Sequence, residues 1–92
     1  MRYVLEISDT ALDDIEKHKK AGDKSVLKKI DTLLKELMDH PTTGTGQPEM
    51  MKYDYFGTYS RRINKKHRLI YSIEAEIVTV HVLSMWGHYG DK

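Results

Sequence analysis

The sequence predicts a small α+β domain in which a two-helix hairpin packs on one face of a twisted, mainly antiparallel sheet of four to five strands. Three observations predict this fold: a strongly periodic helix preceded by a shorter one, a loop rich in glycine and proline, and three strand-like segments after that loop. A chain of 92 residues is too short to divide, so residues 1–92 are expected to form a single domain.

The N-terminal half predicts one strand followed by two helices. Apolar and polar residues alternate over 2–7, which is typical of a short strand. Polar residues at 8–10 can cap a first helix, which we expect to run to about residue 20 with Leu12 and Ile15 on its inner face. The second helix ends before Pro41, and its apolar residues recur at helical spacing. They are Val26, Leu27, Ile30, Leu33, Leu34, Leu37 and Met38.

The C-terminal half predicts a loop and then strands. Residues 42–51 contain Gly44, Gly46 and Pro48, which indicate a loop. The strand-like segments that follow are residues 58–63, 67–73 and 77–83. Residues 64–66 and 74–76 separate them, and links of this length suit hairpins between antiparallel neighbours.

Positive charge is concentrated in one part of this half. Residues 52–68 contain six cations and a single acid, Asp54, so this stretch has a net charge of +5 although the whole chain carries only +1. The cations are Lys52, Arg61, Arg62, Lys65, Lys66 and Arg68. Such a local excess is typical of a phosphate-binding or nucleic-acid-binding surface. We expect the basic side chains to project from the sheet face that the helices leave open.

Strand periodicity indicates which arginines can act together. Side chains alternate along a strand, so Arg62 points away from Arg61, and Arg62 and Arg68 can meet on a common face if the hairpin register allows. Two neighbouring guanidiniums repel each other unless an anion joins them, as a phosphate would. The alternative is that Arg61 and Arg62 merely decorate a solvated strand.

Glu49 and His88 are candidates for proton transfer. Glu49 follows Pro48, whose fixed φ stiffens the loop, and an imidazole such as that of His88 titrates close to neutrality. Taken singly, a loop glutamate or a surface histidine is more often idle. The remaining histidines show no metal-ligand spacing and the chain has no cysteine, so we expect no metal and no cofactor. No apolar run is long enough to cross a bilayer, and we expect a cytoplasmic protein.

Several short segments follow one another in a characteristic order and spacing. They are Gly-Thr-Gly-Gln-Pro-Glu-Met-Met-Lys-Tyr at 44–53, Gly57, Ser-Arg-Arg-Ile at 60–63, His-Arg-Leu-Ile-Tyr at 67–71, and His88-Tyr89. Together they resemble the YoeB/Txe-type toxins of the RelE superfamily, which are toxin–antitoxin proteins that cut messenger RNA on the ribosome. The resemblance covers nearly the whole chain and implies the RelE-like microbial ribonuclease fold.

The resemblance also implies roles for individual residues in metal-independent RNA cleavage. Glu49 would act as general base, His88 as general acid, and Arg68 would stabilise charge on the phosphate, while Tyr89 would contact the substrate near the cut. Lys52 and Arg62 would hold phosphates. From the basic run itself, we also expect Arg61 and Lys65 among the RNA-binding residues. The nucleophile would be the 2′-OH of RNA, which DNA lacks.

The implied partners are a cognate acidic antitoxin and mRNA in the decoding site of the ribosome, with operator DNA reached only through the antitoxin and no membrane. The sequence leaves undecided whether the protein forms a homodimer, because aromatic residues found in the first helix of similar proteins are absent here. Two other functions are compatible with the same fold: a ParE-like protein that binds DNA gyrase, and an RNA-binding module without catalysis. The co-occurrence of Glu49, Arg68 and His88-Tyr89 favours the ribonuclease, because a pure binding protein needs none of them.

Overall fold

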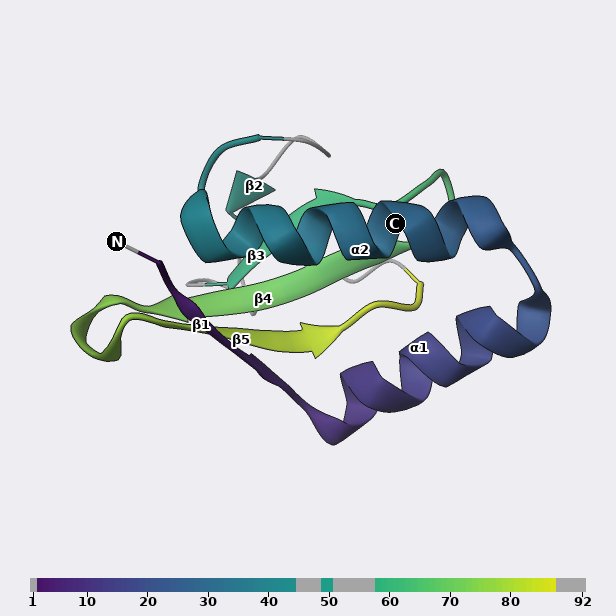
Figure 1. Cartoon of the computed structure of the whole chain (residues 1–92), viewed down its shortest axis with the longest axis horizontal. Helices are drawn as coiled ribbons and strands as arrows, with labels where there is room; N and C mark the ends of the chain where they lie inside the picture. The colour runs from purple at the N-terminus through teal and green to yellow at the C-terminus, as the bar shows by residue number, and fades with distance from the viewer. Residues whose placement is uncertain (1, 45–48, 51–57, 88–92) are drawn as a thin grey trace.

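A computed structural model describes residues 2–44, 49–50 and 58–87 of the chain. Two helices lie on one face of a five-stranded sheet whose strand order is β1-β5-β4-β3-β2 (Figure 1). The α+β fold predicted from the sequence is therefore confirmed. The elements are β1 (Val4–Ile7), α1 (Asp9–Ala21), α2 (Lys24–Asp39), β2 (Glu49–Met50), β3 (Thr58–Arg62), β4 (Arg68–Glu74) and β5 (Thr79–Ser84), with a short 3₁₀ turn at Ala75–Ile77.

The sheet is mainly antiparallel, with one parallel pair at its edge. β3 pairs with β4 and β4 with β5 as two successive antiparallel hairpins, as the short links at 64–66 and 74–76 predicted. β1 pairs parallel to β5, so the last strand lies between the first strand and β4. The two-residue strand β2 pairs with β3 in a segment that the sequence predicted as loop.

Side-chain caps define where the helices begin. The Ser8 hydroxyl accepts a hydrogen bond from the backbone N–H of Ala11 (3.0 Å) and so caps α1. Gly22 ends that helix in a left-handed conformation, with φ of 75°. Asp23 caps α2 through the backbone N–H groups of Ser25 and Val26. The Ser25 hydroxyl also donates to the Asp23 carboxylate, and this hydrogen bond is the main reason that the pKa of Asp23 lies below its ordinary value.

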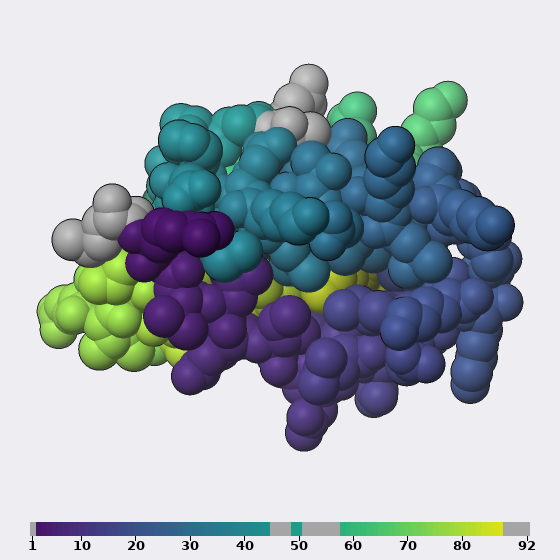
Figure 2. Space-filling view, in the orientation of Figure 1, coloured from purple at the N-terminus to yellow at the C-terminus, as the bar shows by residue number. Residues whose placement is uncertain are grey.

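The core lies between the helices and the sheet. α2 buries four apolar residues at helical spacing, in agreement with its predicted inner face. These are Val26, Ile30, Leu33 and Leu37. They form one cluster with Leu69, Tyr71, Val80 and Val82 of the sheet. Figure 2 shows the two helices covering this face, with yellow atoms of the C-terminal part visible between them.

The inner face of α1 differs from the prediction. Leu12 was expected to face the core but is 49% exposed, whereas Ile15 packs against the core as predicted. The buried residues of α1 are Ala11, Asp14 and His18. Two of the three are polar, so a search for apolar periodicity alone assigned this face incorrectly.

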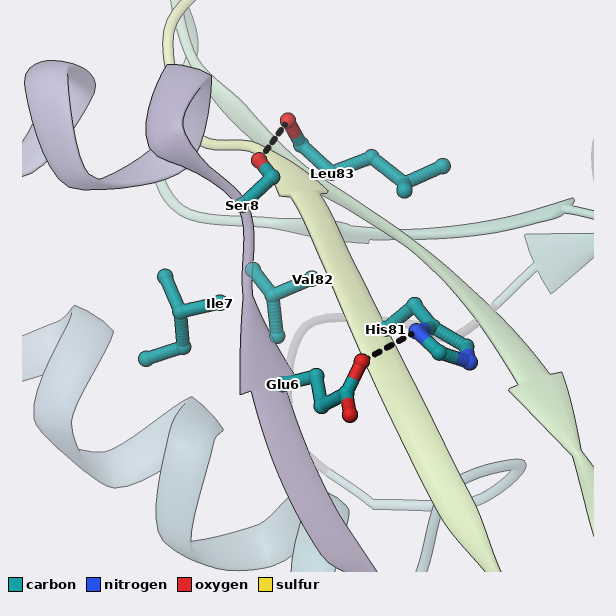
Figure 3. A pocket seen from close by; sticks show the side chains of 6 residues that line it. All are labelled: Glu6, Ile7, Ser8, His81, Val82 and Leu83. Carbon is teal, nitrogen blue, oxygen red and sulfur yellow. Dashed lines mark hydrogen bonds and ion pairs between the residues drawn. The ribbon is translucent and has the colours of Figure 1, made fainter. Parts of the chain in front are cut away.

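A small pocket lies over the paired ends of β1 and β5, at the edge of the sheet away from β3 (Figure 3). The Ser8 hydroxyl donates to the Leu83 carbonyl (2.9 Å) on one side of it. On the other side, His81 Nδ1 lies 3.2 Å from a Glu6 carboxylate oxygen, and the His81 Nε2 atom contacts Glu74. These contacts join three neighbouring strands.

None of the helices in the described part of the chain is long and apolar enough to span a membrane.

The core predicts the stability of the domain. Leu33 is fully buried, so Leu33→Ala removes its packing and leaves a cavity; we expect a loss of about 2–5 kcal/mol in the free energy of unfolding. Leu12→Ala is the matched control, because the half-exposed Leu12 should contribute no more than about 0.5 kcal/mol. Urea unfolding of both variants measures the difference. Equal losses would contradict the assigned inner faces.

Candidate functional site

Two arginines lie side by side on the sheet face opposite the helices, the helix-free face. In the β3–β4 hairpin Arg62 is directly opposite Arg68, so both side chains leave the sheet on the same side. Arg62 is exposed, and the partly exposed Arg68 donates from Nη1 to the hydroxyl of Ser60 (3.1 Å). The shared face predicted from strand alternation is confirmed, and two adjacent guanidiniums can bind one phosphate.

Glu49 is on the same face. β2 pairs with β3 so that Glu49 is directly opposite Ser60, and directly opposed side chains of an antiparallel pair point the same way. Glu49 is exposed, and Ser60, its partner in the register, accepts a hydrogen bond from Arg68. A carboxylate, a hydroxyl and two guanidiniums therefore share one face. Ser60 was not singled out from the sequence, although its two-residue spacing from Arg62 places it on the same face.

Arg61 has a different environment from its neighbour. It was expected among the RNA contacts, but its side chain is fully buried on the helix face of β3, so we exclude it from the RNA-binding residues. Nη1 bonds Glu36 (3.1 Å), and Nη2 donates to the carbonyl oxygens of Thr43 (2.7 Å) and His40. Nε donates to the Tyr71 hydroxyl (3.2 Å). Buried charge is tolerated only with such complete pairing.

Tyr71 extends this network to the loop after α2. Its hydroxyl donates to the Pro41 carbonyl (2.6 Å) while accepting from Arg61. Burial raises the pKa of Tyr71 above its ordinary value, which keeps the hydroxyl protonated and able to donate; the nearby Arg61 charge opposes that shift. Together, Arg61 and Tyr71 bind the backbone of residues 40–43, at the start of the loop that leads to Glu49.

The loop also packs closely at Gly44. This residue has φ of 111°, and an added Cβ would lie 2.4 Å from Glu36 Oε1 and 3.2 Å from Arg61 Nη1. Any larger residue would therefore displace the Arg61–Glu36 pair. The glycine predicted as a loop signal is thus required both by its backbone conformation and by the space available.

The chain after β5 returns to the arginine pair. The backbone N–H of Arg68 donates to the carbonyl oxygen of Gly87 (2.9 Å), so the residue that precedes His88 lies beside the start of β4. Lys65 is exposed in the β3–β4 turn. Lys52, His88 and Tyr89 lie outside the described residues. Within the described residues no three potential ligands among His, Cys, Asp and Glu are grouped so as to hold a metal ion.

Fold and sequence together define the class of protein. The family model described as the YoeB-like toxin of a bacterial type II toxin–antitoxin system matches residues 7–89. The chain is therefore a toxin of the type II class. Within this class, it belongs to the YoeB-like family.

Individual relatives agree with this assignment. Toxin YoeB of Synechocystis sp. is 47% identical over 52 residues, which are 56% of this chain and 60% of that protein. The matched stretch thus spans less than two thirds of that relative.

Solved structures match over nearly the full chain. A YoeB/ParE toxin from Agrobacterium tumefaciens superposes with a TM-score of 0.85 at 30% identity, covering 94% of this chain and 99% of that one. YoeB from Staphylococcus aureus, solved as a dimer, gives 0.78 at 36% identity and covers 97% of this chain and all of that one. The same toxin in a heterotetrameric complex with YefM gives 0.77, with the same coverage.

The contrast between adjacent arginines gives a direct test. Arg61→Ala leaves Glu36 and two carbonyl oxygens without their donor in the interior, so we expect a loss of about 3–5 kcal/mol in the free energy of unfolding. Arg62→Ala removes an exposed side chain and should change stability by less than about 0.5 kcal/mol. Denaturant unfolding of both variants measures these free energies. An Arg61→Ala protein as stable as the wild type would show that the buried network is dispensable.

Proposed function

We propose that this toxin is a ribosome-dependent endoribonuclease that cleaves mRNA without a metal ion and so inhibits translation. The observation that supports this most directly is the Arg62–Arg68 pair on the same face as Glu49 and Ser60, with Gly87, the residue before His88, bonded to Arg68. This arrangement suits a phosphate with proton-transfer groups around it. Membership of the YoeB-like family supports the same function.

In the proposed reaction, Glu49 accepts the proton of a ribose 2′-OH as this oxygen attacks the adjacent phosphorus. The bond from the 2′-oxygen to phosphorus forms and the bond to the 5′-oxygen breaks, and His88 gives its proton to the leaving oxygen. The products are a 2′,3′-cyclic phosphate and a 5′-OH end. Arg68 stabilises the charge that develops on the phosphate, as fixed donors do in acyl and phosphoryl transfer.

The remaining residues position the RNA. Arg62, Lys52 and Lys65 hold phosphates along the RNA strand, and Tyr89 packs against or hydrogen-bonds the RNA near the cleaved bond. A net charge of +5 over residues 52–68 is modest for an enzyme that grips free RNA. The decoding site of the ribosome would therefore supply much of the substrate positioning. Activity on translating ribosomes would place the toxin in the cytoplasm.

An acidic antitoxin segment is the proposed partner of the helix-free face, which it would neutralise by covering the arginine pair. The complex of the Staphylococcus aureus toxin with YefM supports an antitoxin partner, and the dimer of that toxin supports a homodimer. Electrostatic complementarity would make association fast and sensitive to salt. Operator DNA would be reached only through the antitoxin.

Cleavage of ribosome-bound mRNA tests the proposal and the role of Arg68 together. We expect new mRNA ends on translating ribosomes and slow cleavage of the same naked mRNA. Arg68→Ala should lower the single-turnover rate by about 10²–10³-fold, because one fixed donor to the developing charge is lost. Arg2→Ala, on the opposite edge of the sheet, is the matched control and should cleave normally. If the protein instead bound DNA gyrase and produced no new mRNA ends on ribosomes, the ParE-like function would be favoured.

Substitution of the leaving oxygen separates the proposed acid from the proposed base. With ordinary RNA the pH–rate profile should be bell-shaped, and its alkaline limb should reflect loss of the His88 proton, so the rate falls as pH rises. His88→Gln should slow cleavage about 10²–10⁴-fold, but much less when sulfur replaces the 5′-oxygen, since a thiolate leaves without protonation.

Glu49→Gln provides the comparison in the same assay. It should slow both substrates alike, because the 2′-OH must attack in either case. If the His88→Gln defect is as large on the sulfur substrate as on ordinary RNA, His88 is not the acid, and Tyr89 or Arg68 becomes the candidate donor.

A further inference from the structure

Two buried histidines lie under the chain segment that follows β5. His18, on α1, is 2% exposed, and His67, just before β4, is 8% exposed. Their ring centroids are 4.7 Å apart in an edge-on arrangement. Trp86 contacts both, at centroid distances of 4.8 Å from His18 and 4.4 Å from His67. The proposed reaction uses neither imidazole, and each is a buried polar group that is hydrogen-bonded to the backbone.

His67 binds the backbone of Gly87. The Gly87 N–H donates to His67 Nδ1 (2.9 Å), which requires that Nδ1 carry no proton. The Gly87 carbonyl oxygen accepts from the backbone N–H of Arg68 (2.9 Å). Both backbone groups of Gly87 are therefore held by two consecutive residues. Gly87 has φ of 82°, a left-handed conformation that turns the chain at this point.

α1 binds the backbone of Met85 in the same manner. The Met85 N–H donates to the Asp14 carboxylate (2.8 Å), and the Met85 carbonyl oxygen accepts from His18 Nε2 (2.8 Å). Asp14 and His18 are one helical turn apart, so a single face of α1 supplies both partners. Residues 85 and 87 are thus each bonded at N–H and C=O although both lie outside the strand ladder, and side chains supply three of the four partners.

We propose that Asp14, His18 and His67 are positioning residues for the proposed cleavage reaction. They fix the direction in which the chain leaves β5, and His67 fixes the peptide immediately before His88 against Arg68. The inference rests on the proposed function in one respect: it takes His88 as a participant in the chemistry. A displacement of about 1 Å in a reacting group can cost about 10²-fold in rate, so a loosened Gly87 should lower kcat.

Paired amide substitutions test which ring nitrogen matters. The side-chain oxygen of asparagine can take the place of Nδ1, whereas the side-chain end of glutamine takes the place of Nε2. His67 uses Nδ1, so His67→Asn should keep kcat within about threefold while His67→Gln lowers it by about 10–100-fold, with KM unchanged in both. His18 uses Nε2, so the order should reverse: His18→Gln should be active and His18→Asn impaired.

A merely space-filling role would not make asparagine the better replacement at one histidine and glutamine the better replacement at the other. If these histidines only filled space, asparagine and glutamine would rank the same way at both positions. Any pattern other than the crossed one would overturn the inference. If thermal melting shows that His67→Gln does not fold, the two His18 variants still test the proposal. A more active His18→Gln supports it, and a more active His18→Asn contradicts it.

A readout without RNA keeps this inference separate from the proposed function. Hydrogen exchange of the Gly87 amide, followed by ¹⁵N NMR, should be slow in the wild type and in His67→Asn and at least tenfold faster in His67→Gln. Equal protection in all three proteins would show that His67 does not hold Gly87. If the wild type cleaved no mRNA on ribosomes, the proposed function would fail, while the exchange rates would still decide whether this contact exists.

Discussion

The buried guanidinium of Arg61 connects the parts of this small domain that carry the candidate site. It lies between the sheet and the end of α2, where a carboxylate, a phenol and two backbone carbonyl oxygens receive its donors. A charge in this position is tolerated only while all its partners remain in place. The conformation of residues 40–44 is therefore coupled to the core, and the segment leading to Glu49 starts from a fixed point.

The two ends of the candidate site are held by similar chemistry. On one side, Arg61 and Tyr71 bind the carbonyl oxygens of the loop before Glu49. On the other, Asp14, His18 and His67 bind backbone groups of residues 85 and 87, ahead of His88. In both cases a buried polar side chain binds main-chain atoms of a segment outside the regular helices and strands. Loops without a ladder of hydrogen bonds need such partners if they are to present side chains accurately.

Much of this arrangement was accessible from the sequence. The periodicity of α2 and the hairpin links predicted the layers, and two-residue alternation predicted the Arg62–Arg68 pair. The same alternation placed Arg61 on the opposite face, but arginine is so rarely buried that its charge was assigned to the surface. Asp14 and His18 were missed because only apolar residues were sought on the inner face of α1. Their partners are main-chain atoms far along the chain, which no local pattern reveals.

The position of β5 has a consequence for synthesis of the chain. β5 lies between β1 and β4, so β1 has no neighbour in the sheet until residues 79–84 have been made. Pairing between the first and last strands is highly non-local and forms late. While a ribosome is still translating β5, the nascent toxin cannot complete its sheet or bring Gly87 to Arg68. The order of synthesis thus delays completion of the sheet until residues 79–84 have been made and are free to pair.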